Sequence, residues 1–395
     1  NVLVYFFPEI SAHDKRYYHH RLACSYHLQQ EIMSIPRDLH ITSRQVCYYS
    51  NDCLMKAIID DDLSLFTDII LKNNVNLVEF KFKKSRYELS EFINENEPSL
   101  IEAAAFYGSV EIFKYLLMQG VPLSQKLPSF TISGGNPELF GIIEDLFDLY
   151  NISLFDNIEA AIRYHRNDIF EYLRSNSLFN NEYANSNESA VFSDSNDLIL
   201  HSFIKSIEYY NISIFLELLP QMSSLLNHTN QLGQTPVHIA IECSSLYFLE
   251  FILNVYKNEI NINVKDQWYE TPLMRAVYYG NIKMVEILCN FHGIDVNCVD
   301  DYGWTPLLKA CYFGHFDIVK LLCKQPNINI NCKKNDNETP LHVAANKGYC
   351  NIVTFLCSLD GILINEENND KRTPKKLALM QRRNEIAEFL SHFDN

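Results

Sequence analysis

The dipeptide Thr-Pro recurs at a nearly constant spacing through the second half of the chain, and this regularity constrains the fold more than any other feature. The copies begin at Thr235, Thr271, Thr305, Thr339 and Thr373, with steps of 36, 34, 34 and 34 residues. A fixed period of about 20 to 50 residues is typical of a repeat protein, in which one unit cannot bury its apolar face alone. The period therefore predicts a solenoid of similar units that stack on their neighbours.

The residues after each Thr-Pro pair predict a helix, a turn and a second helix. The four full copies read Thr-Pro-Val-His-Ile-Ala, Thr-Pro-Leu-Met-Arg-Ala, Thr-Pro-Leu-Leu-Lys-Ala and Thr-Pro-Leu-His-Val-Ala. Threonine caps a helix, proline is tolerated in its first turn, and the apolar residues at helical spacing bury one face. Gly280, Gly314 and Gly348 follow at the helix end, where glycine permits the left-handed conformation that redirects the chain. Polar residues such as 300–303 precede the threonine and predict a turn.

This phrase resembles the ankyrin repeat. Each of the four full units also ends on an asparagine: Asn263, Asn297, Asn331 and Asn365. Weaker copies in the same phase lie at residues 52–69, 99–117, 126–143, 156–173 and 201–219, so the resemblance covers roughly residues 50 to 395. It implies an all-α chain, an ankyrin-repeat α-solenoid of helix–turn–helix repeats with β-turn fingers. The Asn-, Ile- and Tyr-rich composition, with degenerate N-terminal copies, resembles the large ankyrin-repeat families of protists.

The repeat pattern divides the chain into four regions. We expect a helical N-terminal cap at residues 1–50, degenerate ankyrin-like helical repeats at 51–174, a polar loop at 175–200 and regular repeats at 201–395. The loop is expected because an Asn- and Ser-rich stretch interrupts the period there. The final copy carries Gln381, Arg382 and Arg383, and such a polar face suits a C-terminal cap that no further repeat covers.

Charge and composition argue against several classes of partner. The formal net charge of −16 disfavours nucleic acid and anionic lipid, which attract basic surfaces. No stretch approaches the ~18 apolar residues of a membrane span, and the apolar run at residues 2–7 is too short for a signal peptide.

The eleven cysteines are odd in number and several share one repeat phase, which favours packing over disulfides. We therefore expect a reduced, cytoplasmic protein that is a monomer. The chain starts at Asn1 rather than at Met, which leaves open whether further sequence precedes it.

No group of residues predicts catalysis, a metal site or a cofactor. A metal-like cluster of His19, His20, Cys24 and His27 lacks the second ligand pair that zinc sites usually have, so half-buried helix residues are the better interpretation. The cysteines at 289, 323 and 357 recur every 34 residues and are expected to pack in the core. His238 and His342 occupy the histidine position of the repeat phrase, where hydrogen bonding between loops is a better account than base catalysis.

The aromatic residues predict a partner-binding site. The resemblance implies that finger tips and the exposed ends of the first helices line a concave groove. At those positions two adjacent units hold Trp268, Glu270, Tyr278, Tyr279, Asp301, Tyr302, Trp304, Tyr312 and Phe313. Trp and Tyr are favoured at interface hot spots. Glu270, Asp300 and Asp301 would give the groove an acidic rim, which favours a partner with basic and apolar side chains. The alternative is that these rings pack on the adjoining finger.

These patterns predict a non-enzymatic scaffold that presents the groove to a protein or peptide partner. Three other functions stay open at this point. The chain could be a substrate adaptor in protein turnover, the regulatory region of a longer protein with an upstream catalytic domain, or a structural protein that associates with itself.

Overall fold

The computed structural model describes residues 50–82, 97–150, 155–179 and 195–393, and the predicted all-α fold is confirmed there. Within these ranges the only extended pairing is an isolated bridge between Lys81 and Ser99. The chain divides into two compact units, residues 1–186 and 187–395. The predicted N-terminal cap at residues 1–50 lies almost wholly outside the described residues.

The first unit is built of helix pairs, one in each of the weaker repeat copies that it contains. The pairs are α3 (Ser50–Ile59) with α4 (Leu63–Asn73), α6 (Leu100–Tyr107) with α7 (Val110–Met118), α8 (Leu127–Gly134) with α9 (Pro137–Tyr150), and α10 (Phe155–Arg163) with α11 (Asn167–Phe179). Helices α3, α6, α8 and α10 contact one another in succession. Ile58, Phe66, Ala104 and Phe113 are fully buried in the core that joins the first two pairs.

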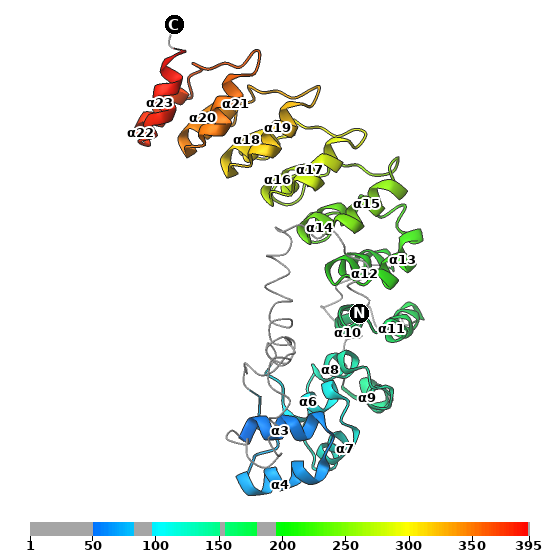
Figure 1. Cartoon of the computed structure of the whole chain (residues 1–395). Coiled ribbons are helices and arrows are strands. Elements are labelled where there is room, and N and C mark those ends of the chain that lie inside the picture. Colours follow the sequence, from blue (N-terminus) through cyan, green and yellow to red (C-terminus); the bar gives the residue numbers. More distant parts are fainter. Residues whose placement is uncertain (1–49, 83–96, 151–154, 180–194, 394–395) are drawn as a thin grey trace, which may run out of the picture. The chain divides into compact units, whose positions relative to one another are not determined.

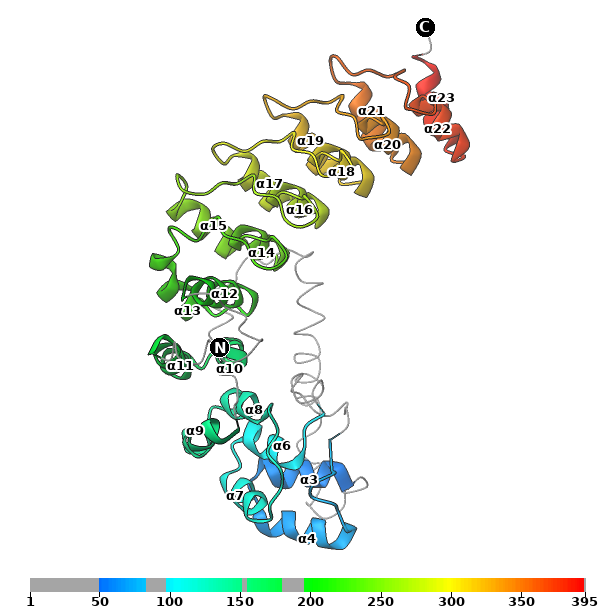
Figure 2. The same cartoon turned by 180° about the vertical axis from the view of Figure 1, so that it is seen from behind.

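The second unit repeats the same arrangement with greater regularity. Its first helices are α12 (Ser195–Glu208), α14 (Pro236–Glu242), α16 (Pro272–Tyr278), α18 (Pro306–Phe313), α20 (Pro340–Lys347) and α22 (Pro374–Met380). Its second helices are α13 (Ile212–Leu218), α15 (Leu246–Val255), α17 (Ile282–Cys289), α19 (Phe316–Cys323), α21 (Cys350–Cys357) and α23 (Asn384–Ser391). The first helices stack along one side of this unit and the second helices along the other (Figures 1 and 2).

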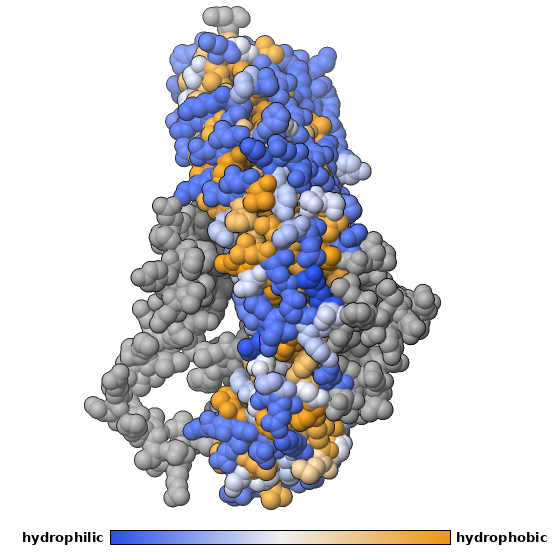
Figure 3. Space-filling model, turned by 90° about the vertical axis from the view of Figure 1, so that its right-hand side faces the viewer, coloured by the Kyte–Doolittle hydropathy of each residue, from blue (hydrophilic) through white to orange (hydrophobic). Residues whose placement is uncertain are grey.

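The segment expected to be a polar loop is partly helical. Helix α11 continues to Phe179 and helix α12 starts at Ser195, so both extend into residues 175–200. Residues 180–194, between the two helices, lie outside the described part of the chain. At the other end of the unit, Gln381, Arg382 and Arg383 are exposed, as the polar cap requires. Hydrophilic residues predominate at this C-terminal end on the face drawn in Figure 3.

The repeat phrase adopts the predicted local structure. The hydroxyl groups of Thr271, Thr305, Thr339 and Thr373 each accept a hydrogen bond from a backbone N–H in the first turn of the helix that follows. Gly280, Gly314 and Gly348 have φ angles of 69°, 77° and 92°. His165 and Tyr210, which the weaker copies place at the glycine position, have the same left-handed conformation with φ of 56°. The repeat register therefore holds even where the glycine is missing.

The asparagines that end the repeats connect each unit to the next. The Nδ2 group of Asn297 donates to the backbone oxygen of Asn327 at 2.7 Å, and its Oδ1 atom accepts from the backbone N–H of Asn329 at 2.9 Å. Asn263 makes the same pair of bonds to Gly293 and Asp295, and Asn331 makes them to Gly361 and Leu363. Each of these asparagines thus holds the loop of the following repeat by two backbone hydrogen bonds.

Substitution of Asn297 by alanine should lower the free energy of unfolding by about 1 kcal/mol, because two hydrogen bonds in a partly hydrated loop are lost. Urea unfolding of the full chain measures this change. Asn327→Ala is the matched control, since it leaves the accepting backbone oxygen in place and should change stability by less than about 0.5 kcal/mol. An equal loss in both variants would contradict the assigned role.

Candidate functional site

The nine residues expected to bind a partner lie in two adjacent fingers and at the ends of the helices that follow them. Residues 266–270 and 300–304 form the fingers, which lead into α16 and α18 respectively. The exposed fraction is 49% for Trp268, 48% for Tyr278, 74% for Tyr302 and 37% for both Tyr312 and Phe313. These five side chains of the second unit are therefore exposed to solvent and accessible to a partner.

Five of the rings pack on one another in one continuous series, which we call the aromatic row. It consists of Tyr279, Tyr278, Phe313, Tyr312 and Trp304, in that order. Successive ring centroids lie 5.1–5.2 Å apart, and each pair meets edge to face. Such contacts fix the rings and leave little rotamer freedom to be lost on binding. The rings therefore pack against rings of the neighbouring unit and are also exposed to solvent. Packing between units and contact with a partner are both compatible with this arrangement.

Basic side chains lie over three rings at this surface. The guanidinium group of Arg275 lies 4.5 Å from the ring centroid of Trp268, and the ammonium groups of Lys334 and Lys347 lie 5.1 Å from Trp304 and 3.7 Å from Tyr312. These are cation–π distances. Trp268 is thereby held against Arg275 and is not one of the five rings of the row. Within the described ranges Tyr302 makes no ring contact.

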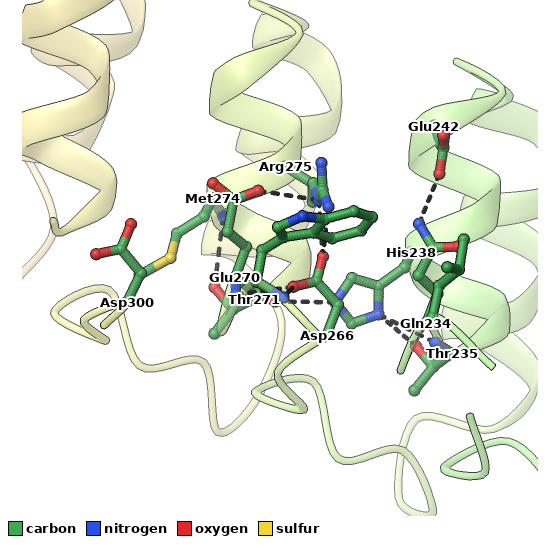
Figure 4. Close-up of polar contacts among 12 residues, drawn as sticks. Gln234, Thr235, His238, Glu242, Asp266, Glu270, Thr271, Met274, Arg275 and Asp300 are labelled. Atoms are coloured by element: carbon green, nitrogen blue, oxygen red, sulfur yellow. Dashed lines mark hydrogen bonds and ion pairs between the residues drawn. The ribbon is translucent and has the colours of Figure 1, made fainter. Parts of the chain in front are cut away.

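A chain of ion pairs joins the two fingers. Arg275 contacts Asp266 at 2.7 Å and Glu270 at 3.0 Å, while Lys309 contacts Glu270 at 2.5 Å and Asp300 at 2.9 Å. Figure 4 shows Asp266, Glu270 and Arg275 converging beside α16. Burial alone would lower the pKa of Arg275, but its hydrogen bond to Asp266 and the charge of Glu270 outweigh this effect and raise it. The arginine therefore stays charged.

The expected acidic rim is wrong for two of its three members. The side chains of Glu270 and Asp300 are only 13% and 5% exposed, and both are neutralised by Lys309. Asp300 also accepts hydrogen bonds from the backbone N–H groups of Tyr302 and Trp304, so its carboxylate stabilises the turn of its own finger. Only Asp301 is exposed as expected. The argument for a basic partner loses its main support, because Glu270 and Asp300 already form ion pairs within the protein.

The sequence interpretation missed Arg275 and Lys309, although a signal for them was present. Both stand four residues after the threonine of the repeat phrase, where other units carry Ile239 and Val343. Two cations replace apolar residues in the same two units that contain the tryptophans. Asp266 and Asp300 begin the corresponding fingers, so acid and base recur at a fixed offset of nine residues.

The histidines of the repeat phrase have the predicted structural role. The Nδ1 atoms of His238 and His342 lie 2.9 Å and 2.8 Å from the hydroxyl groups of Thr235 and Thr339. Their Nε2 atoms lie 3.2 Å and 3.0 Å from the backbone oxygens of Glu270 and Arg372 in the next unit. Burial lowers the pKa of His238 to about 4 and also lowers that of His342. Both rings are therefore neutral at pH 7 and join their own unit to the next one by hydrogen bonds.

Most of the cysteines that the structure describes carry free thiols, and those of the second unit pack as expected. Cys289 is buried, and Cys323 and Cys357 are partly buried. Burial raises the pKa of these three thiols to about 11, 12 and 11, which disfavours the reactive thiolate. Cys53, in the first unit, is disulfide-bonded, so the expectation of packing instead of disulfides is wrong for this cysteine.

The residues that the structure describes hold neither a metal-like cluster nor a membrane-spanning helix. There, no group of three or more His, Cys, Asp and Glu side chains could hold a metal ion. The cluster of His19, His20, Cys24 and His27 lies outside those ranges. No described helix has both the length and the apolar character needed to cross a bilayer.

Stacked helix pairs with intervening fingers define an α-solenoid repeat protein. Residues 247–334 and 326–395 match the family model for ankyrin repeats, which contains three copies of the repeat. Residues 247–395 of this chain therefore carry ankyrin repeats. Ankyrin repeats generally mediate protein–protein interaction. No curated protein matches the chain as a relative.

Proposed function

We propose that this chain is a non-enzymatic cytoplasmic scaffold that binds a protein or peptide partner across the aromatic row and the two neighbouring finger tips. The observation that carries the proposal is the row itself: its rings are fixed by edge-to-face contacts, yet Tyr278, Tyr312 and Phe313 remain 37–48% exposed. Exposed aromatic clusters on monomeric proteins tend to mark interaction sites. Rigid rings bind with a small loss of conformational entropy, which favours their use as anchors.

The free thiols of the second unit support a reducing compartment for the scaffold, whereas the disulfide bond of Cys53 argues against one. The ion pairs between the two fingers support a rigid presentation of the surface, because they fix the fingers to α16 and α18. A partner would therefore meet a preformed surface, and its own side chains would supply the apolar groups that cover the rings.

Selection of peptides from a random display library on the wild-type protein tests the proposal. The dissociation constants of the selected peptides are then measured by fluorescence anisotropy. The double variant Tyr278→Ala with Tyr302→Ala should weaken binding at least about 30-fold, since hot-spot aromatics contribute about 2 kcal/mol or more. Tyr302 is 74% exposed, so its loss should leave the fold intact.

Tyr247→Ala is the matched control, because Tyr247 is 44% exposed but lies on α15, among the second helices. It should leave the dissociation constants unchanged. Peptides that bind the double variant as tightly as the wild type, or a library that yields no binder at all, would overturn the proposed function. Thermal unfolding of each variant confirms that the changes act on binding rather than on folding.

A further inference from the structure

The helices that flank the aromatic row end in residues of opposite charge. Tyr278 and Tyr312 stand seven residues after the threonine that caps their helices. In the preceding unit this position is Glu242, the last residue of α14. In the following unit it is Asn346, and Lys347, the last residue of α20, comes one residue later. Because α14, α16, α18 and α20 contact one another in succession, Glu242, the two tyrosines and Lys347 follow the order acid, aromatic, aromatic, base.

Glu242 and Lys347, together with the exposed Asp301 on the finger between them, are charges that this surface leaves available. Glu242 is exposed and accepts one hydrogen bond, from the Nε2 group of Gln234 at 2.7 Å (Figure 4). Lys347 lies 3.7 Å from the ring centroid of Tyr312. Neither residue forms an ion pair with any residue that the structure describes.

Most of the charges between these two positions form ion pairs within the protein, and Asp301 is an exposed acid among them. Asp266 and Glu270 are paired with Arg275, and Asp300 with Lys309, at side-chain exposures of 15% or less. Lys334 likewise contacts Asp336 and Glu338. A bound segment would therefore meet an acidic group at one end of the aromatic row and a basic group at the other, with mostly paired charges and the exposed Asp301 between them.

We propose that the partner segment is an extended peptide with a basic residue at one end, apolar residues in its centre and an acidic residue at the other end. The basic end lies over Glu242 and the acidic end over Lys347. This inference rests on the proposed function and adds the chemistry and the orientation of the partner. Complementary charges at the edge of an interface set register and orientation more than they set affinity.

The spacing of the helices gives the length of the segment. Packed helices lie about 10 Å apart, so the three steps from α14 to α20 span about 30 Å. An extended chain covers about 3.3 Å per residue, so the two charged residues of the partner are separated by about nine residues. A partner that is basic throughout would place one of its cations against Lys347 and would be disfavoured there.

Selection from a library of random peptides about twelve residues long tests the charge pattern, because that length covers the whole span. On the wild-type protein, selected peptides should share opposite charges about nine residues apart with apolar residues between them. On Lys347→Glu, the acidic residue should be replaced by a basic one. On Glu242→Lys, the basic residue should be replaced by an acidic one.

Affinities of the selected peptides complete the test. A peptide selected on the wild type should bind each charge variant about two- to five-fold more weakly, which is the effect expected for one exposed ion pair. It should bind Lys320→Glu unchanged, because Lys320 lies on α19 and pairs with Asp317. Both effects should diminish at high salt.

The outcomes separate this inference from the function on which it rests. Peptides that depend on Tyr278 and Tyr302 but show no paired charges, or the same charges on all variants, would overturn the charge pattern and leave the scaffold function standing. Peptides that do not depend on those tyrosines would overturn the function itself.

Discussion

Replacement of Arg275 by methionine is expected to lower the free energy of unfolding by about 3 kcal/mol or more. The guanidinium group pairs with Asp266, whose side chain is fully buried, and with Glu270, whose side chain is 13% exposed. Methionine keeps much of the apolar stem but leaves both carboxylates without this partner. An uncompensated buried charge is far more costly than the loss of an exposed ion pair.

Urea unfolding of the full chain, followed by tryptophan fluorescence, measures this effect directly. Both tryptophans of the chain, Trp268 and Trp304, lie in the two fingers that the ion pairs join, so the signal reports on this region. Lys320→Met is the matched control, because its pair with Asp317 is exposed and should contribute less than about 1 kcal/mol.

A second substitution identifies the cause of the loss. Asp266→Asn in the Arg275→Met background removes one uncompensated carboxylate and should restore part of the stability. If Arg275→Met and Lys320→Met are equally mild, the ion pairs contribute little and the finger geometry must depend on its backbone hydrogen bonds instead.

Acid should destabilise the second unit between about pH 6.5 and pH 4, because the buried ring of His238 must gain a proton there. The pKa of this histidine is lowered by burial from 6.5 to about 4. A base with a lowered folded-state pKa stabilises the fold above its unfolded pKa, and this stabilisation is lost as pH falls through the folded value. The difference corresponds to about 3 kcal/mol, and His342 acts in the same direction.

The measurement is a series of urea unfolding curves between pH 7.5 and pH 4 on the wild type and on His238→Gln. Glutamine at this position of a helix can still complete the capping box, but it does not titrate. The variant should therefore lose less stability than the wild type over this interval. His392→Gln, at an exposed position, should follow the wild-type curve. Identical pH dependence in all three proteins would contradict the role of the buried ring.

The repeat architecture was predictable because its determinants are local. Thr305, Pro306 and Gly314 each act within one turn of the chain, and their spacing specifies where a helix begins and ends. Even at His165 and Tyr210, where the glycine is missing, apolar periodicity kept the register, and the backbone is left-handed at both positions.

The electrostatics of the site were harder to predict because they depend on contacts between units. Glu270 precedes Thr271 in a finger and looked like an exposed acid, but Lys309 lies 39 positions later in the chain and 2.5 Å away in space. Asp300 was likewise assigned to a rim, whereas its carboxylate organises its own finger. No single window of sequence contains both partners of such a pair, so the burial of these acids became clear only in the structure.

The two kinds of connection between repeats have different consequences for how the array can change during evolution. The asparagine contacts are the same at three successive junctions of the regular array, so a unit there could be duplicated or removed and the new neighbours would still fit. The ion pairs from Asp266 to Asp300 occur at one junction and require both units together. Recombination can therefore lengthen or shorten the rest of the regular array, while the pair of units that carries the aromatic row must be inherited as a block.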